Sequence, residues 1–330
     1  MATTGSRRYE AFADVAGERQ KQYVFCLRSM ASGAAFPCAF PRATQQAFLE
    51  AHEHAFFYFG GVFRKLRYDN LSSAVRKIVR GQRREETARF IAFRSHWRFQ
   101  AEFCTPGEAH EKGGVEGESG YFRRNHWVPV PVPAANDLDD LNAQLLAACQ
   151  QDEHRVISGR EQSIGAAILV ERDYLLPLAT ERFDLEEIAF PTVDSHRCVR
   201  VRTNCYSVPA APGTTVKAEI YASFVEIWRG GERIARHERC YHRLQQILDL
   251  EHYLDVLHRK PGAFAGSKPL EQQRQAGLWP ACFDTLWSAL NERHGKRNGT
   301  KQMIELLTLG KEHGPVKLQR AVERGHNFAD

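Results

Sequence analysis

The sequence predicts an α/β fold for the first part of the chain, and three observations along it lead to this prediction. Two runs of alternating apolar and polar residues, YEAFADV (9–15) and KQYVFCLRS (21–29), flank the segment AGERQ, a pattern typical of a β-hairpin. The run TQQAFLEAHEHAFFYF (44–59) then changes to helical spacing and stops at Gly60-Gly61. A further short strand, VFRKLRYDN (62–70), follows the helix. Hairpin, helix and strand in this order predict helices packed against a sheet.

The segments on either side of the hairpin complete the first part of this sheet. Residues 1–8, MATTGSRR, have no apolar periodicity, so we expect a disordered leader and ordered structure from about Tyr9. After the hairpin, GAAFPCAF (33–40) predicts a third antiparallel strand.

The most basic segment of the chain, residues 75–94, follows the strand at 62–70. A helix from about 85 to 97 would keep its aromatic side chains inward. FQAEFC (99–104) is then a further strand, which Thr105-Pro106-Gly107 ends.

The rest of the chain predicts separate domains. VPVPVPAAND (128–137) is typical of a rigid extended linker, and Asp137 is a helix cap by residue type. Short strands with glycine turns and then three amphipathic helical runs follow it. The expected domains are a leader (1–8), an α/β core (9–130), a helical linker region (131–186), a small β-barrel (187–240) and a helical C-terminal region (241–330).

Composition excludes several classes of protein. The formal net charge of +5 is compatible with a polyanionic partner, although it is also common among ordinary enzymes. The eight cysteines contain no CxxC pair, so neither a zinc knuckle nor a secreted disulfide framework is indicated. No window approaches the roughly 18 apolar residues that a membrane-spanning helix needs. We therefore expect a cytoplasmic protein with no membrane role.

Two acidic residues are candidates for chemistry because of where they fall. Asp69 ends a predicted strand, the place where ligand sites of open α/β sheets collect, and Glu116 follows the next strand in KGGVEG. In phosphodiester chemistry such carboxylates hold Mg²⁺ ions, which prefer hard oxygen ligands. By position alone, Asp69 could equally form a turn and Glu116 could lie on a solvated helix.

Eight long runs of the sequence carry a further signal: RSMASGAAF, TQQAFLEAHEHAFFYFGGVFRKLRYDNL, REETARFIAFRSHW, EFCTPGEAHEKGGVEGESGYFRRNH, VRVRTNCYSVP, ARHERCY, LDLEHYLDVLHRKPGAFAGSKPLEQ and ERHGKRNGT. These runs resemble the IstA-type transposases of bacterial insertion sequences, a branch of the DDE integrase superfamily. The resemblance extends over nearly the whole chain and is highly specific.

The resemblance implies an RNase H-like (integrase) catalytic core followed by a helical connector, a small β-barrel like that of Mu transposases, and a helical tail. It places the second Asp of the metal-binding triad on Asp69 and the Glu on Glu116. The family's first Asp lies in a pattern Asp-Trp-Tyr-Glu-Ala in the opening strand. Here Tyr9-Glu10-Ala11 matches the end of that pattern, but Arg7 and Arg8 stand where Asp and Trp would be.

We therefore expect an N-terminally truncated chain with an incomplete first strand, whose upstream helix-turn-helix would precede residue 1. Glu10 and Asp14 cannot replace the first Asp, because alternation along a strand points them to the face opposite position 7. The cofactor implied by the family is Mg²⁺ or Mn²⁺, and without the first Asp the isolated chain is expected to be inactive.

The same resemblance implies DNA as the partner, both element ends and target, within a bacterial nucleoid-associated protein. It also implies oligomers with itself or an intact transposase, and an AAA+ ATPase helper. Basic residues near the two carboxylates are candidates for phosphate contacts, although a solvated surface is the simpler interpretation. These residues are Arg76, Lys77, Arg80, Arg83, Arg84, Lys112, Arg123 and Arg124.

Three functional hypotheses follow. The first is a DNA transposition and integration protein whose family performs metal-dependent strand cleavage and transfer. The second is a non-catalytic DNA- or transpososome-binding remnant that interferes with an intact transposase. The third is an unrelated metal-dependent nuclease, which would need a third carboxylate beside Asp69 and Glu116.

Overall fold

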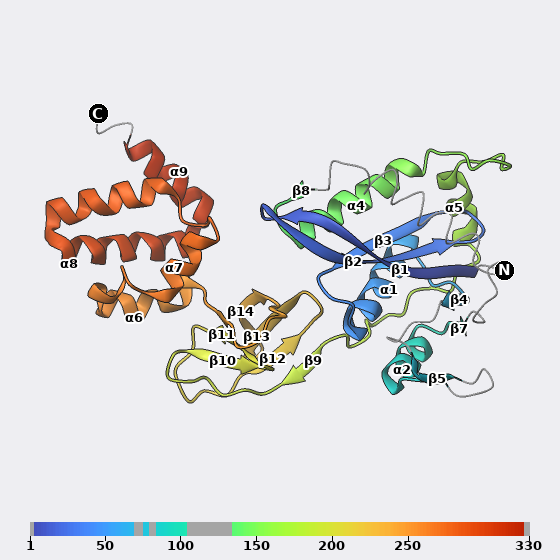
Figure 1. The fold of residues 1–330 in the computed structure, drawn as a ribbon, viewed down its shortest axis with the longest axis horizontal. Helices are drawn as coiled ribbons and strands as arrows, with labels where there is room; N and C mark the ends of the chain where they lie inside the picture. The colour runs from blue at the N-terminus through green and yellow to red at the C-terminus, as the bar shows by residue number, and fades with distance from the viewer. Residues whose placement is uncertain (1–2, 69–74, 79–83, 104–133, 327–330) are drawn as a thin grey trace. The chain divides into compact units, whose positions relative to one another are not determined.

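The computed structural model describes residues 3–68, 75–78, 84–103 and 134–326, and these form two compact units (Figure 1). Unit 1 contains residues 1–186 together with 221–223, and unit 2 contains 187–220 and 224–330. Each unit has its own apolar core. No helix in the described ranges is long and apolar enough to cross a membrane.

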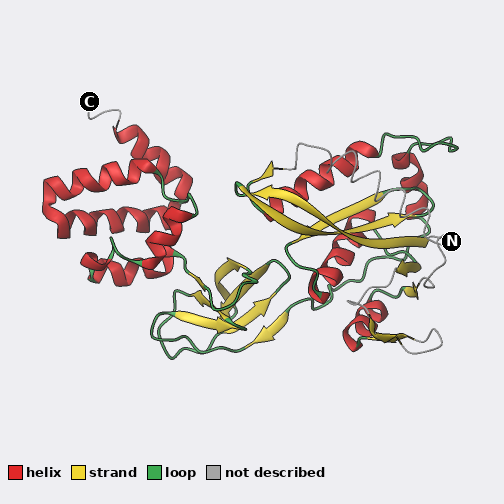
Figure 2. Ribbon diagram, viewed as in Figure 1, coloured by secondary structure: helices red, strands yellow, loops and turns green. Residues whose placement is uncertain are grey.

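A mixed sheet forms the centre of unit 1 (Figure 2). Its strands lie in the order β3-β2-β1-β4-β7, and β8 pairs with β1 as well. Strands β1, β2 and β3 form an antiparallel meander, whereas β4 runs parallel to β1 and β7 runs parallel to β4. The strands are β1 (Thr3–Val15), β2 (Glu18–Ser29), β3 (Ala35–Phe40), β4 (Lys65–Tyr68), β7 (Gln100–Phe103) and β8 (Ala134–Ala135).

The hairpin at the start of the chain confirms the sequence prediction, but its first strand begins earlier than expected. β1 starts at Thr3, so residues 3–8 are strand rather than a leader. The reason is pairing with other strands: residues 4–8 pair with β2 and residues 3–6 with β4, which gives their backbone polar groups hydrogen-bond partners without any apolar periodicity in the segment. The two-residue turn Ala16-Gly17 has positive φ at both positions, the geometry that joins twisted strands.

The helix α1 (Gln45–Phe59) confirms the predicted helix and carries much of the core. The Thr44 side chain accepts from the Ala47 amide at its start, and Gly60 ends it with φ 75° in the left-handed region. α2 (Ala88–His96) begins after Thr87, which caps it, and this is three residues later than the sequence predicted. Residues before Thr87 instead form β6 (Arg84–Glu86), paired with β5 (Val75–Ile78).

Helices cover the other face and one edge of the sheet. α4 (Leu138–Asp152), capped by Asp137 as predicted, packs against a cluster that includes Ala11, Ala13 and Val24. The Asn142 side chain accepts from the Ala39 amide and donates to the Ala39 carbonyl. These two bonds satisfy backbone groups on the edge strand β3. α5 (Ile164–Arg172) follows in the predicted helical linker region.

Unit 2 begins with two sheets around one apolar core, where the sequence predicted a barrel. One sheet has the order β10-β11-β15 and the other β14-β13-β12-β9. Their strands are β9 (Glu187–Ala189), β10 (Cys198–Val201), β11 (Asn204–Ser207), β12 (Lys217–Ile220), β13 (Phe224–Arg229), β14 (Glu232–Glu238) and β15 (Gln246–Ile247).

The predicted helical C-terminal region completes unit 2. Its longest element, α8, is broken at Gly295, whose φ of 77° and ψ of 153° are not helical, so that it comprises two helical runs. The elements are η3 (Leu250–Tyr253), α6 (Leu254–Arg259), η4 (Pro261–Ala263), α7 (Lys268–Gln275), α8 (Ala281–His313) and α9 (Pro315–His326).

Candidate functional site

The pairing of β1 with β4 defines the part of the candidate site that the structure describes. The parallel register begins at Thr3 beside Lys65 and ends at Ser6 beside Tyr68. Arg7 is the next residue of β1, and it lies in the strand. Asp69, the residue after Tyr68 in the chain, lies outside the described residues, and so does Glu116.

Buried side chains of β4 and β1 belong to apolar clusters on opposite faces of the sheet. Leu66 and Tyr68 of β4 are fully buried in the core that α1 and α2 cover. Ala11 and Ala13 of β1 lie in the opposite cluster, which α4 covers. Tyr9 and Val15 lie in the same cluster, as the alternation of side chains along a strand requires.

A buried histidine supports the end of β4. The Tyr68 hydroxyl donates to Nε2 of His52 at 3.0 Å, and Nδ1 of His52 donates to the Phe48 carbonyl at 2.6 Å. Burial lowers the pKa of His52 to about 4, and the bond to Phe48 opposes this only in part. The ring is therefore neutral near pH 7, with its two nitrogens in fixed donor and acceptor roles.

His52 should make unit 1 less stable as the pH falls. Its pKa is about 6.5 when unfolded and about 4 when folded, so between these values the unfolded chain binds a proton that the folded chain does not. The stabilisation is complete above pH 6.5 and falls by about 3 kcal/mol down to pH 4. Urea unfolding at several pH values measures the effect.

The variant His52→Gln isolates this effect from other groups. The pKa of Glu53 is raised by burial to about 7, which changes stability in the opposite direction over an overlapping range. The stability difference between the unaltered chain and His52→Gln should therefore shrink between pH 7 and pH 4. A difference that stayed constant would show that His52 does not titrate in this way.

Glu102 on β7 is a described carboxylate beside β4 that sequence reasoning did not single out. It lies opposite Arg67 in the register, and its oxygens accept from Lys65 at 2.7 Å and from Arg67 at 3.1 Å. The hydrogen bond from Lys65 is the main cause that lowers the pKa of Glu102, and the bond from Arg67 adds to it against the opposing effect of burial. With both oxygens committed to cations, Glu102 is not a free metal ligand. Only the register of β4 and β7 could have revealed the pair.

The structure describes few of the basic candidates. Arg76 and Lys77 lie in β5, and Arg84 lies in β6. These strands form a two-stranded antiparallel sheet, so the three positions are brought onto one small element. The candidates that lie outside the described residues are Arg80, Arg83, Lys112, Arg123 and Arg124.

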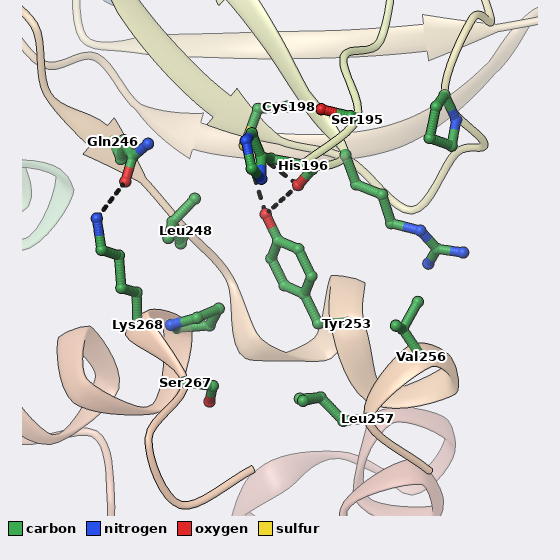
Figure 3. Close-up of a pocket in the computed structure, with 13 residues that line it drawn as sticks. Ser195, His196, Cys198, Gln246, Leu248, Tyr253, Val256, Leu257, Ser267 and Lys268 are labelled. Carbon is green, nitrogen blue, oxygen red and sulfur yellow. Dashed lines mark hydrogen bonds between the residues drawn. The ribbon is translucent and has the colours of Figure 1, made fainter. Parts of the chain in front are cut away.

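Unit 2 contains a cavity of about 500 Å³ (Figure 3). The Tyr253 hydroxyl points between Cys198 and the carbonyl of His196, to which it donates at 3.0 Å. Burial raises the pKa values of both Cys198 and Tyr253. Neither group is an anion near pH 7, so this cavity offers no activated nucleophile. Among the residues that the structure describes, no cluster of three or more histidine, cysteine or acidic side chains suits a metal ion.

Comparisons of the sequence with known proteins find transposases among those it is similar to. The family model described as "Mu transposase, C-terminal domain" matches residues 178–249, a range that includes both sheets of unit 2. A protein of Aminobacter aminovorans named "Transposase" is 32% identical over 320 residues, which cover 95% of this chain and 61% of that protein. The "Transposase for insertion sequences IS1326/IS1353" of Pseudomonas aeruginosa is 31% identical over 324 residues, with the same two coverages.

The chain thus spans about 61% of the length of these curated relatives. Among solved structures, the integrase catalytic core domain of HTLV-2 in complex with magnesium is 12% identical. That alignment covers 50% of this chain and 94% of the other. Its TM-score of 0.33 is too low to define the fold.

Proposed function

We propose that this chain is a DNA transposition and integration protein of the IstA type. The observation that carries the proposal is the similarity to named transposases, which continues over 95% of the chain and so includes both units. The match of residues 178–249 to the C-terminal domain of Mu transposase supports it independently of the first unit's core.

The proposed core is RNase H-like. An antiparallel meander extended by two parallel strands, in the order β3-β2-β1-β4-β7, fits the integrase core that the sequence resemblance implies. Helix α1 lies between β3 and β4 in the chain, as a parallel crossover requires.

The proposed site lies at the end of the β1–β4 pairing. If the register continues by one residue, position 7 lies beside position 69. Alternation would then put position 7 on the side of Ala11 and Ala13 and position 69 on the side opposite Leu66 and Tyr68, so that the two would share a face. Glu116 would complete the site.

The residues present fit a divalent metal poorly. Mg²⁺ and Mn²⁺ take hard, preferably anionic oxygen ligands, and two of the three proposed positions supply them through Asp69 and Glu116. The third position carries Arg7, whose cation opposes metal binding and supplies no acceptor. We therefore expect weak metal occupancy in the unaltered chain.

The proposed partners follow from the same function. DNA would be held in part by the basic positions of β5 and β6, within a self-assembled complex at the bacterial nucleoid. An AAA+ ATPase helper is the further partner that an IstA-type protein would use.

Nicking of a supercoiled plasmid in Mg²⁺ or Mn²⁺ tests the proposal, because it requires no knowledge of an element end. The unaltered chain should give no metal-dependent nicking. The double variant Arg7→Asp, Arg8→Trp should nick, since it restores the third carboxylate and its neighbour, and adding Glu116→Ala should abolish the activity.

Two outcomes would contradict this account. Robust nicking by the unaltered chain that disappears in Glu116→Ala would show that another group replaces the first carboxylate. Metal binding by the double variant without any action on DNA would contradict the proposed function itself.

A further inference from the structure

The helix α8 folds back on itself as a closely packed hairpin (Figure 1). A Cβ on Gly299 would lie 2.5 Å from the Leu290 carbonyl carbon, so the backbones of the two helical runs approach each other closely there. Nε1 of Trp287 donates to the hydroxyl of Thr300 at 3.0 Å across the same interface. The turn around Gly295 is therefore held in place by the packing behind it.

This turn concentrates unpaired positive charge. Four cationic side chains and one acidic side chain, Glu292, lie within residues 292–301. All five are exposed, and within the described ranges none of the four cations makes a salt bridge. We call the four cations the hairpin tip: Arg293, Lys296, Arg297 and Lys301.

Several other cations of unit 2 are paired with carboxylates. On β14, Arg233 and Arg236 both pair with Glu226, a carboxylate that is only 8% exposed. Elsewhere in the unit, Arg197 pairs with Asp255 and Arg274 with Asp284. Charges in such pairs are partly neutralised by their partners, whereas those of the hairpin tip are available to a ligand.

We infer that the hairpin tip binds the phosphate backbone of duplex DNA without reading its sequence. Unpaired cations on a rigid turn are favourable for binding a regular polyanion, because the backbone of the turn does not lose conformational entropy when the ligand binds. Arg297 and Lys301 are four residues apart on one helix and share a face. Residues 291–301 contain no aliphatic or aromatic apolar side chain, which disfavours insertion of this turn into a membrane. The identification of the polyanion as DNA rests on the proposed function.

The test is the salt dependence of binding to a fluorescently labelled duplex of arbitrary sequence, measured by anisotropy with the full chain. The variant carries Arg293→Gln, Lys296→Gln, Arg297→Gln and Lys301→Gln. A matched control removes four exposed cations from the end of α8 and from α9 by Lys311→Gln, Lys317→Gln, Arg320→Gln and Arg324→Gln. Both variants change the net charge equally, and their melting temperatures are compared to verify folding.

The tip variant should bind at least about tenfold more weakly at low salt. Its slope of log affinity against log salt should be shallower by up to about 3.6, since each of the four lost phosphate contacts removes about 0.9. The control should change both quantities by much less. Equal losses in the two variants, or no binding by the unaltered chain, would overturn the inference.

Two further outcomes separate this inference from the proposed function. If DNA binding survives in the tip variant while plasmid nicking behaves as predicted, the inference fails and the proposed function stands. If DNA binding depends on the hairpin tip but no variant nicks the plasmid, the inference stands and the proposed function fails. Tip-dependent binding to phosphatidylserine vesicles with none to DNA would also overturn the inference.

Discussion

Arg7→Asp should give the chain a stabilisation by Mn²⁺ that the unaltered chain lacks. The substitution removes a cation and adds a carboxylate at the position that follows the β1–β4 register, beside the proposed place of Asp69. A ligand that binds only the folded state stabilises it by about 2.7 kcal/mol at one hundred times its dissociation constant. For a unit of this size the melting temperature should rise by several degrees, which a thermal melt with and without Mn²⁺ measures.

The neighbouring residue supplies the control. Arg8→Asp makes the same change in charge one residue further on, at a position that strand alternation would put on the other face of the sheet. It should give no Mn²⁺ effect, and adding Glu116→Gln to Arg7→Asp should remove most of the gain. Equal stabilisation of the Arg7→Asp and Arg8→Asp variants would show that position 7 has no special relation to a metal site.

Phe56→Ala should destabilise unit 1 by about 3–5 kcal/mol. The Phe56 ring is fully buried, with ring centroids 5.4 Å from Trp97, 5.9 Å from Phe99 and 6.3 Å from Phe93. It joins α1 to α2 and to the segment that leads into β7, so its loss leaves a cavity at the centre of the core. Because natural domains are stable by only about 5–15 kcal/mol, this is a large share of the total.

Phe57→Ala is the matched control for this substitution. Phe57 is the next residue of the same helix, but it is 39% exposed and points away from the centre. Its loss should cost about 1–2 kcal/mol, because the ring gives up partial burial, an edge contact with Trp97 and the Arg182 guanidinium that lies 4.7 Å from its centroid. The two variants are compared by urea unfolding. Similar costs for both would mean that the aromatic cluster around Phe56 does not stabilise unit 1 in the way described.

The local elements of unit 1 could be predicted because their signals are short-range. Helix 44–59 has an apolar face, a threonine cap and a glycine stop, and the structure places α1 at Gln45–Phe59. The hairpin likewise follows from two alternating runs around a tight turn. The start of β1 could not be predicted, because residues 3–8 become a strand through pairing with β2 and β4 rather than through their own sequence.

The candidate site could be predicted only in part. Asp69 and Glu116 were identified by resemblance, and the structure supplies the register that leads to position 69 without describing either residue. Which charges are free is also decided by tertiary contacts. The sequence alone does not distinguish Arg233 from Arg297, yet a buried glutamate pairs with the first and the second has no salt bridge among the described residues.

The separation between the carboxylates of Asp69 and Glu116 tests the central claim most directly. A crystal structure of the chain in which both residues are ordered would provide it. The account predicts about 4–8 Å between the two groups without metal, on the face of β4 opposite Tyr68, since such carboxylates hold metal ions about 3.5–4 Å apart. A separation above about 12 Å, with both segments well ordered, would contradict the assignment of the site.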